Sequence, residues 1–133
     1  MLETGIKGHR EEVATHEKSA QYLDSGNVDV FATVMMIAMM EKTCLDSVLP
    51  FLEEGQDTVG TYVDVSHCSA TPVGMKVWCD SELVEIDRRR LVFRVSAYDE
   101  RGLIGEGRHE RFIITKEKFL SKTYSNKCQK SKS

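Results

Sequence analysis

The chain has 133 residues and a mass of 15.1 kDa, a size at which proteins usually form one compact domain. Hydrophobic residues make up 41% and charged residues 29% of the sequence, as in ordinary globular proteins. The net charge of −3 provides no positive field that would attract nucleic acid, so we expect no nucleic-acid partner. The longest apolar run extends only from Val34 to Met40, which is too short to span a membrane.

The N-terminus and the cysteines both favour a cytoplasmic protein. Residues 1–10 carry charges but no apolar core of a signal peptide. No two cysteines form a CxxC pair and none has a histidine at zinc-finger spacing, so we predict reduced thiols rather than disulfides or a structural zinc site. The cysteines are Cys44, Cys68, Cys79 and Cys128.

The first half of the chain predicts an edge strand, a loop and a helix. Valine, alanine and threonine mixed with charges favour an edge strand within residues 6–19, and Asp, Ser, Gly and Asn favour a loop over 22–27. The sequence becomes helical from Thr33, and a proline and a glycine within residues 50–55 bracket the helix end. Because residues 34–40 are apolar on every side, we expect other structure to surround this helix.

Four strand-like stretches separated by polar turns follow the helix and predict an antiparallel meander. One strand, a long buried helix and a meander are the α+β layout of the hot-dog fold, in which a curved five-stranded antiparallel sheet wraps around a central helix. This domain is expected to cover residues 1–120, and the Lys- and Ser-rich segment 121–133 is expected to be a mobile tail. The expected strands are 58–69, 74–86, 91–98 and 103–115.

Glu41 is the first candidate catalytic residue, because it directly ends the apolar run of the helix. It shares a helical stripe with Ile37, Cys44 and Val48, so we expect its carboxylate to point inward. Loss of hydration raises the pKa of such a carboxylate, and perturbed carboxylates are common at working sites. The alternative is a glutamate at the rim of the apolar face whose carboxylate reaches water or caps a loop.

His67 is the second candidate. Strict alternation along residues 58–69 places it on the apolar face together with Val59 and Thr61. An imidazole there can act as an acid or a base near neutral pH. The alternative, which is more common for a lone histidine, is a structural hydrogen bond to a buried group.

Thr33 is the third candidate, because it stands where the helix begins. The free N–H groups and the positive end of the helix dipole at this place can stabilise an oxyanion formed from an attacked carbonyl. The alternative is an ordinary N-cap, in which the threonine hydroxyl accepts a hydrogen bond from the first turn.

The three candidates together match a family pattern in residue type and spacing. The segments VFATVMMIAMMEKTCLDSVLPFL and TVGTYVDVSHCSATPVGMKV closely resemble the hot-dog thioesterases related to fluoroacetyl-CoA thioesterase, and the resemblance continues through LVFRVSAYDERGLIGEGRHERFII. In that family a Thr at the helix start, a Glu eight residues later and a His 26 residues beyond form the catalytic set. Thr33, Glu41 and His67 reproduce all three positions.

The resemblance also implies two substrate-binding residues, Gly60 and Arg111. The backbone of Gly60 lies against the thioester in family members, and a residue without a Cβ permits such an approach. The alternatives are a β-bulge or tight bend at Gly60 and a surface cation at Arg111. His109, between Arg108 and Glu110, is expected at an exposed rim.

The implied function is that of an acyl-CoA thioesterase acting on a small acyl thioester, with coenzyme A entering as part of the substrate and no metal or redox cofactor. A homodimer or a higher even oligomer is expected, because one such sheet leaves an edge strand and part of an apolar helix uncovered. Residues 22–27 lack the phenylalanine of the aromatic lid in the fluoroacetate-specific enzyme, so we expect no selectivity for fluorine.

Two other functions fit the same residues. One is a non-catalytic acyl-CoA-binding or sensor domain on the same fold, and the other is a hot-dog enoyl-thioester hydratase. The sequence does not specify the acyl chain length, nor whether Glu41 acts as nucleophile or general base.

Overall fold

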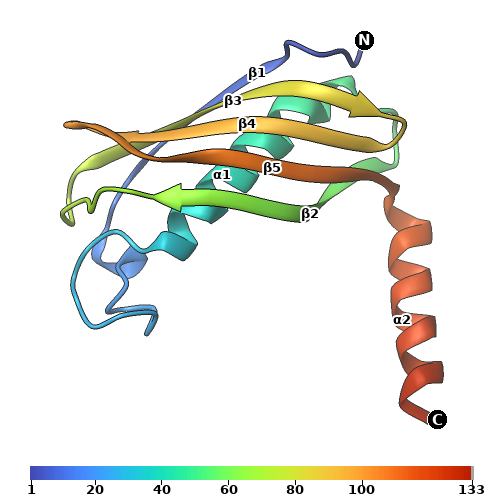
Figure 1. Ribbon diagram of the computed structural model, residues 1–133. Coiled ribbons are helices and arrows are strands. Elements are labelled where there is room, and N and C mark those ends of the chain that lie inside the picture. Colours follow the sequence, from blue (N-terminus) through green and yellow to red (C-terminus); the bar gives the residue numbers. More distant parts are fainter. Residues whose placement is uncertain (133) are drawn as a thin grey trace.

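The computed structural model describes the backbone of residues 1–132 and side chains through Ser125. Helix α1 (Thr33–Val48) packs on one face of a curved five-stranded antiparallel sheet, and helix α2 (Lys116–Lys132) projects from the end of that sheet (Figure 1). This is the hot-dog arrangement that the sequence predicted. The strands are β1 (Lys7–Val13), β2 (Gln56–His67), β3 (Lys76–Asp87), β4 (Arg90–Asp99) and β5 (Gly102–Thr115), with short 3-10 helices η1 (His16–Lys18) and η2 (Leu49–Phe51).

The strand order in the sheet is β1-β3-β4-β5-β2. Only β3, β4 and β5 form a meander, so the expectation of four consecutive meander strands is wrong. The physical reason is that β1 occupies the outer edge of β3, in register from Lys7 opposite Glu82 to Val13 opposite Lys76. The second strand therefore pairs with β5 at the far side of the sheet, where its other edge has no neighbouring strand among the residues that the structure describes.

The core lies between α1 and the sheet. The helix contributes Met36, Met39 and Met40, each at most 1% exposed, and the sheet contributes Leu83 and Phe93 among others. The helix is not surrounded on every side as expected, because Val34 at its first turn is 51% exposed and Ala38, one turn later, is exposed as well. An apolar stripe of α1 therefore remains open beside β2.

The C-terminal segment is helical. Residues 121–132, within the segment that the sequence predicts to be a mobile tail, continue α2 from Lys116, and the mobility stays a prediction. The helix thus crosses the expected domain boundary at residue 120, and the division there stays a prediction. Among the residues that the structure describes, no helix is both long and apolar enough to cross a membrane.

Three of the cysteines are free thiols, as predicted. Cys44 and Cys79 are buried and Cys68 is exposed, whereas Cys128 lies outside the residues with described side chains. Burial raises the pKa of the Cys79 thiol to about 11 and also raises the pKa of Cys44, so both remain protonated and unreactive at neutral pH.

Candidate active site

The first group of the site joins the start of α1 to the end of β2. Thr33 Oγ1 lies 2.7 Å from Nδ1 of His67. The alternative role of Thr33 as an N-cap is wrong, because Ala32 is the N-cap and no side chain caps this helix. As the first helical residue, Thr33 keeps its hydroxyl free for the imidazole.

The imidazole of His67 is held in its neutral form. Burial lowers its pKa, with a smaller opposing effect from a hydrogen bond to the Ser69 backbone. Its Nε2 atom is buried and has no hydrogen-bond partner among the side chains and backbone that the structure describes. The ring therefore carries one satisfied nitrogen and one unused nitrogen, which suits a group that exchanges a proton.

Buried polar contacts hold the two loops that carry this pair. The Phe31 N–H donates to the Thr71 carbonyl at 3.0 Å, and the Thr71 hydroxyl donates to Asp99 Oδ2 at 2.8 Å. Asp99 also accepts from the Arg101 N–H at 2.8 Å. The segment before α1 and the segment after β2 are thereby fixed to the β4–β5 turn, which keeps Thr33 opposite His67.

A cavity of about 250 Å³ opens beside the hydroxyl–imidazole pair. Its walls come from the loop before α1, the first turn of α1 and the end of β2. They consist of Ala20, Ser25, Val30, Phe31, Thr33, Val34, His67, Ser69 and Ala70. A cavity of this size with mostly small and apolar walls suits a short acyl group.

A β-bulge in β2 shapes the second group of the site. The register with β5 shifts between Gly60 and Tyr62, so the extra residue turns Gly60 to the inner face that also carries His67. Val59 then pairs with the exposed Phe112 on the outer face. The predicted alternation, which placed Val59 with His67, is wrong because a bulge inserts one residue into the pattern.

Gly60 lets the Glu41 carboxylate lie directly against the backbone of β2. A Cβ at this glycine would come within 2.7 Å of Glu41 Oε2 and within 3.4 Å of Arg111 Nη1. The bulge, which the sequence left open as an alternative for Gly60, is confirmed, whereas the approach of a thioester to the Gly60 backbone stays a prediction.

Arg111 is buried, with 6% of its surface exposed, so the alternative of a surface cation is wrong. Its Nε donates to Thr58 Oγ1 at 2.8 Å and its Nη2 donates to the Thr58 carbonyl at 2.9 Å. Its Nη1 lies 3.8 Å from Glu41 Oε2. The guanidinium is thus anchored on β2 and faces the carboxylate with its remaining nitrogen.

Glu41 sits at the rim of the buried face rather than pointing inward as expected. Its side chain is 43% exposed. The sheet covers the side of α1 that carries Met36, Met39, Met40 and Thr43, and this orientation leaves Glu41 on the open side beside β2. The carboxylate therefore meets both solvent and the buried guanidinium.

His109 is 1% exposed, so its expected position at an exposed rim is also wrong. Along a strand, alternate residues share a face, which places His109 with Arg111 and Ile113 on the inner side. Arg108 and Glu110 point to the outer side. The prediction of an exposed His109 was drawn from these charged neighbours, which lie on the opposite face. Alternation with the apolar Ile113 was the signal for its burial.

The two groups are separate within one chain. Thr33 meets His67, and Glu41 meets Gly60 and Arg111, but no hydrogen bond or ion pair among the described residues joins Glu41 to either member of the first group. Eight residues of helix separate Thr33 from Glu41, which corresponds to about 12 Å along the axis. One chain alone therefore does not bring the three predicted catalytic residues into contact.

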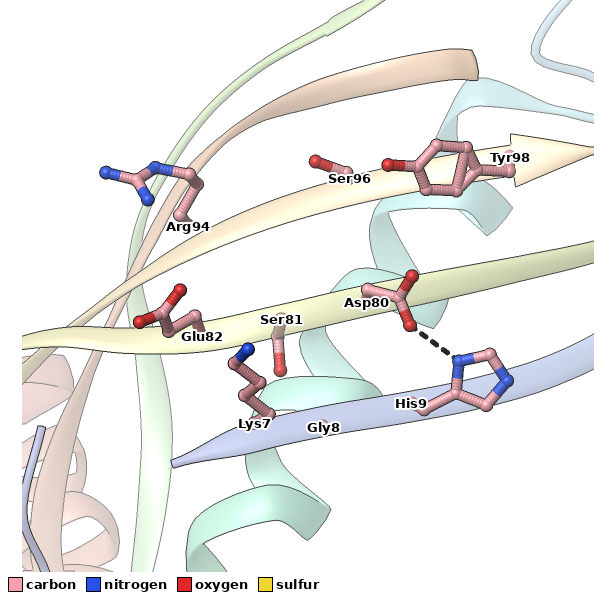
Figure 2. A pocket seen from close by; sticks show the side chains of 9 residues that line it. All are labelled: Lys7, Gly8, His9, Asp80, Ser81, Glu82, Arg94, Ser96 and Tyr98. Atoms are coloured by element: carbon pink, nitrogen blue, oxygen red, sulfur yellow. Dashed lines mark hydrogen bonds and ion pairs between the residues drawn. The ribbon is translucent and has the colours of Figure 1, made fainter. Parts of the chain in front are cut away.

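A further hollow of about 510 Å³ lies on the outer face of the sheet, with α1 behind the strands (Figure 2). Its side chains carry charges of both signs, including Lys7, Arg94 and Glu82, and His9 Nδ1 lies 2.6 Å from Asp80 Oδ1. None of the predicted catalytic residues lines it. This surface is distinct from the site between α1 and β2.

The imidazoles on the two faces are expected to titrate in opposite directions from the usual value of 6.5. Burial lowers the pKa of His67 and of His109, whereas hydrogen bonds to Asp80 and then Glu11 raise the pKa of His9. Proton NMR titration of the ring Cε1–H signals, assigned with single-histidine variants, should give inflections below 6.5 for the first two and above 6.5 for His9. A His67 inflection above that of His9 would contradict the described burial.

The fold is that of a hot-dog protein, with the candidate site residues on the open side of its central helix. The family model of fluoroacetyl-CoA-specific thioesterases matches residues 14–117, and the chain belongs to this family. The fluoroacetyl-CoA thioesterase of Streptantibioticus cattleyicolor is 45% identical over 94 residues, which cover 71% of this chain and 68% of that protein.

Two solved structures support the same assignment. A variant of the fluoroacetyl-CoA-specific thioesterase in complex with fluoroacetate and CoA is 36% identical, with a TM-score of 0.84 over 89% of this chain and 99% of that chain. A thioesterase superfamily member from Thermus thermophilus is 32% identical, with a TM-score of 0.90 over 100% of this chain and 98% of that chain.

Proposed function

We propose that this protein hydrolyses acyl-CoA thioesters with Thr33, Glu41 and His67 as catalytic residues. The observation that carries the proposal is the Thr33–His67 hydrogen bond of 2.7 Å at the mouth of a small cavity at the start of α1. Membership of a thioesterase family supports it, as does the relative that binds fluoroacetate and CoA. No metal or redox cofactor enters the proposal, and coenzyme A is part of the substrate.

In the proposed reaction, the thioester carbonyl lies at the first turn of α1. This turn has no side-chain cap among the described residues, so the N–H groups of Thr33 and Val34 remain available to the oxyanion that forms when the carbonyl is attacked, whereas the Met35 N–H donates to the Ala32 carbonyl at 3.0 Å. In one route Glu41 attacks the carbonyl, the C–S bond breaks, and water then hydrolyses the resulting anhydride; in the other route Glu41 activates the water directly. Neutral His67 accepts a proton from that water and passes it to the sulfur of the departing CoA. The oxygen of one water ends in the carboxylate product, and CoA leaves as the free thiol.

The distance between the two groups favours a site shared by two chains. The second strand has a free edge, and beside it Val34, Val63 and Tyr62 are each more than 40% exposed. If two copies pair their β2 strands antiparallel with Val63 of one strand opposite Asp64 of the other, His67 of one strand lies opposite Gly60 of the other. We therefore propose a homodimer in which Glu41 of one chain works with the partner subunit's His67.

Light scattering should show a dimer or a higher even assembly, and mixing two inactive variants should test the shared site. In a heterodimer of Glu41→Gln and His67→Ala chains, one of the two sites keeps both native residues if the residues act across the interface. Refolding an equimolar mixture should restore about a quarter of the native activity. A monomer that turns over thioesters, or a mixture as inactive as its components, would contradict the shared site.

A panel of acyl-CoA thioesters of increasing chain length, followed by release of free thiol, tests the proposed function itself. Hydrolysis of the short members is expected. Tight binding of acyl-CoA without thiol release would instead indicate a sensor domain. Loss of the enoyl absorbance of crotonyl-CoA without thiol release would indicate a hydratase.

The loop before α1 predicts little discrimination between acetyl-CoA and fluoroacetyl-CoA. Of residues 22–27, only Ser25 lines the cavity, beside Ala20, Val30 and Phe31 from the flanking chain. Tyr22 is 57% exposed and packs edge-on against His16, with ring centroids 5.4 Å apart. The two substrates should differ by less than about tenfold in kcat/KM, since small changes in a substrate group are weakly distinguished by a simple pocket. A fluoroacetyl preference of several orders of magnitude would show that this interpretation of the loop is wrong.

A further inference from the structure

His109 lies beneath the carboxylate–guanidinium group and contacts neither solvent nor the first group of the site. It is 1% exposed, and its ring stacks against Phe93 of β4 with centroids 6.4 Å apart. A Cβ at Gly60 would approach its Cε1 atom to 3.3 Å, which places the ring directly behind the position where Glu41 meets β2. The side chain is therefore packed firmly in one orientation.

The two ring nitrogens have partners that determine where the proton sits. Nδ1 lies 2.8 Å from the Tyr62 carbonyl, which can only accept a hydrogen bond, so Nδ1 must carry the hydrogen. Nε2 lies 3.1 Å from Nη1 of Arg111, which can only donate, so Nε2 must present its lone pair. The contacts thus require a neutral ring protonated at Nδ1.

This lone pair completes the anchoring of Arg111. Thr58 accepts from Nε and Nη2 of the guanidinium, and Nε2 of His109 accepts from Nη1, the same nitrogen that faces Glu41. Without the imidazole acceptor, Nη1 would have no buried hydrogen-bond partner among the described residues, and the planar guanidinium could tilt on its two bonds to Thr58, which would change the position of Nη1 relative to the carboxylate. The bulge at Gly60 brings all these groups together at one place on β2.

We infer that His109 is a positioning residue for the thioesterase reaction: its Nε2 lone pair holds Nη1 of Arg111 against Glu41, and its Nδ1–H is fixed by the Tyr62 carbonyl. This inference rests on the proposed function. His109 acts only through Arg111 and touches neither the substrate nor Glu41. Displacement of a catalytic group by about 1 Å can cost up to about a hundredfold in rate, so the position of this guanidinium matters.

Two substitutions separate the roles of the two ring nitrogens. A glutamine amide oxygen reaches about as far as Nε2 and keeps the acceptor for Arg111, whereas an asparagine amide nitrogen reaches about as far as Nδ1 and keeps only the donor to Tyr62. His109→Asn should lower kcat by at least about tenfold, and His109→Gln should stay within about threefold of the native enzyme. Arg108→Gln, next along β5 but on the outer face, is the control and should leave kcat unchanged.

Non-additivity tests whether His109 works through Arg111. In an Arg111→Lys background, which removes the guanidinium fork, His109→Asn should cause no further loss of kcat. Equal loss of kcat in the asparagine and glutamine variants, or a lower melting temperature in both with unchanged kcat, would overturn the inference. A full additional loss in the Arg111→Lys background would overturn it as well.

A measurement without turnover separates this inference from the proposed function. Long-range ¹H–¹⁵N NMR spectra of the native protein at neutral pH should show His109 protonated at Nδ1 and unprotonated at Nε2, and the Arg111 Nη1–H, which donates to His109 Nε2, should exchange faster with water in His109→Asn than in His109→Gln. A ring protonated at Nε2, or equal exchange in both variants, would overturn the inference. If the protein releases no thiol but these spectra are as expected, the proposed function fails while the positioning of Arg111 stands.

Discussion

His67→Ala is expected to lower kcat for acyl-CoA hydrolysis by at least about a hundredfold, the usual scale for losing a general acid or base. The imidazole is the partner of Thr33, its other nitrogen is unused, and burial lowers its pKa so that it is neutral and able to accept a proton at pH 7. Thr33→Val should cost less, because the N–H groups of the helix start remain in place. The kcat of both variants is measured from the steady-state rate of thiol release.

The control for this substitution is His9→Ala, which removes an imidazole from the outer face of the sheet (Figure 2). It should leave kcat unchanged. Because His67→Ala removes only the solvent-exposed hydrogen bond to Thr33, while Nε2 makes no described hydrogen bond, the melting temperature should change little. A native kcat in the His67→Ala variant would show that His67 is not a catalytic residue.

Glu41→Gln is the second substitution with a large expected effect, again at least about a hundredfold in kcat. The amide keeps the size of the side chain but can neither attack the thioester nor take a proton from water. The fold should survive, although the buried Arg111 loses its carboxylate neighbour. Because the Glu41 side chain is 43% exposed, water compensates much of that loss, and we expect a cost in unfolding free energy of at most about 1 kcal/mol.

Asp46→Asn is the matched control, since it makes the same change from carboxylate to amide on the exposed side of α1. Asp46 pairs with Lys42 at 3.5 Å and with Arg10 at 3.7 Å, and neither partner is one of the site residues. Chemical denaturation and thiol release should be measured on both variants. A Glu41→Gln protein that is fully active but markedly less stable would show that Glu41 is structural and would favour the sensor domain.

The elements of the fold could be predicted because their signals are local. The apolar run after Thr33 predicted α1 from its first residue, and turn residues delimited all four later strands to within a few positions. Strand pairing could not be predicted in the same way. Whether β2 joins β3 or β5 depends on the competition of β1 for the edge of β3, which is a contact between residues distant in sequence.

The candidate residues could be predicted from type and spacing, but their surroundings could not. The exposure of Glu41 depends on how α1 is rotated against the sheet, and the inner position of Gly60 depends on a bulge that alternation does not reveal. His109 was misjudged from its charged neighbours, although on a strand those neighbours face the other side. The N-cap alternative placed the Thr33 hydroxyl on the backbone of the helix, whereas this hydroxyl lies 2.7 Å from Nδ1 of His67 at the far end of β2.

The most direct measurement is the rate of CoA thiol release from acetyl-CoA by the native protein beside the Glu41→Gln/His67→Ala double variant, purified identically and verified as folded by circular dichroism. The proposed site predicts that the native protein releases thiol at least about a hundredfold faster than the double variant. Equal rates for the two folded proteins would contradict catalysis by these residues.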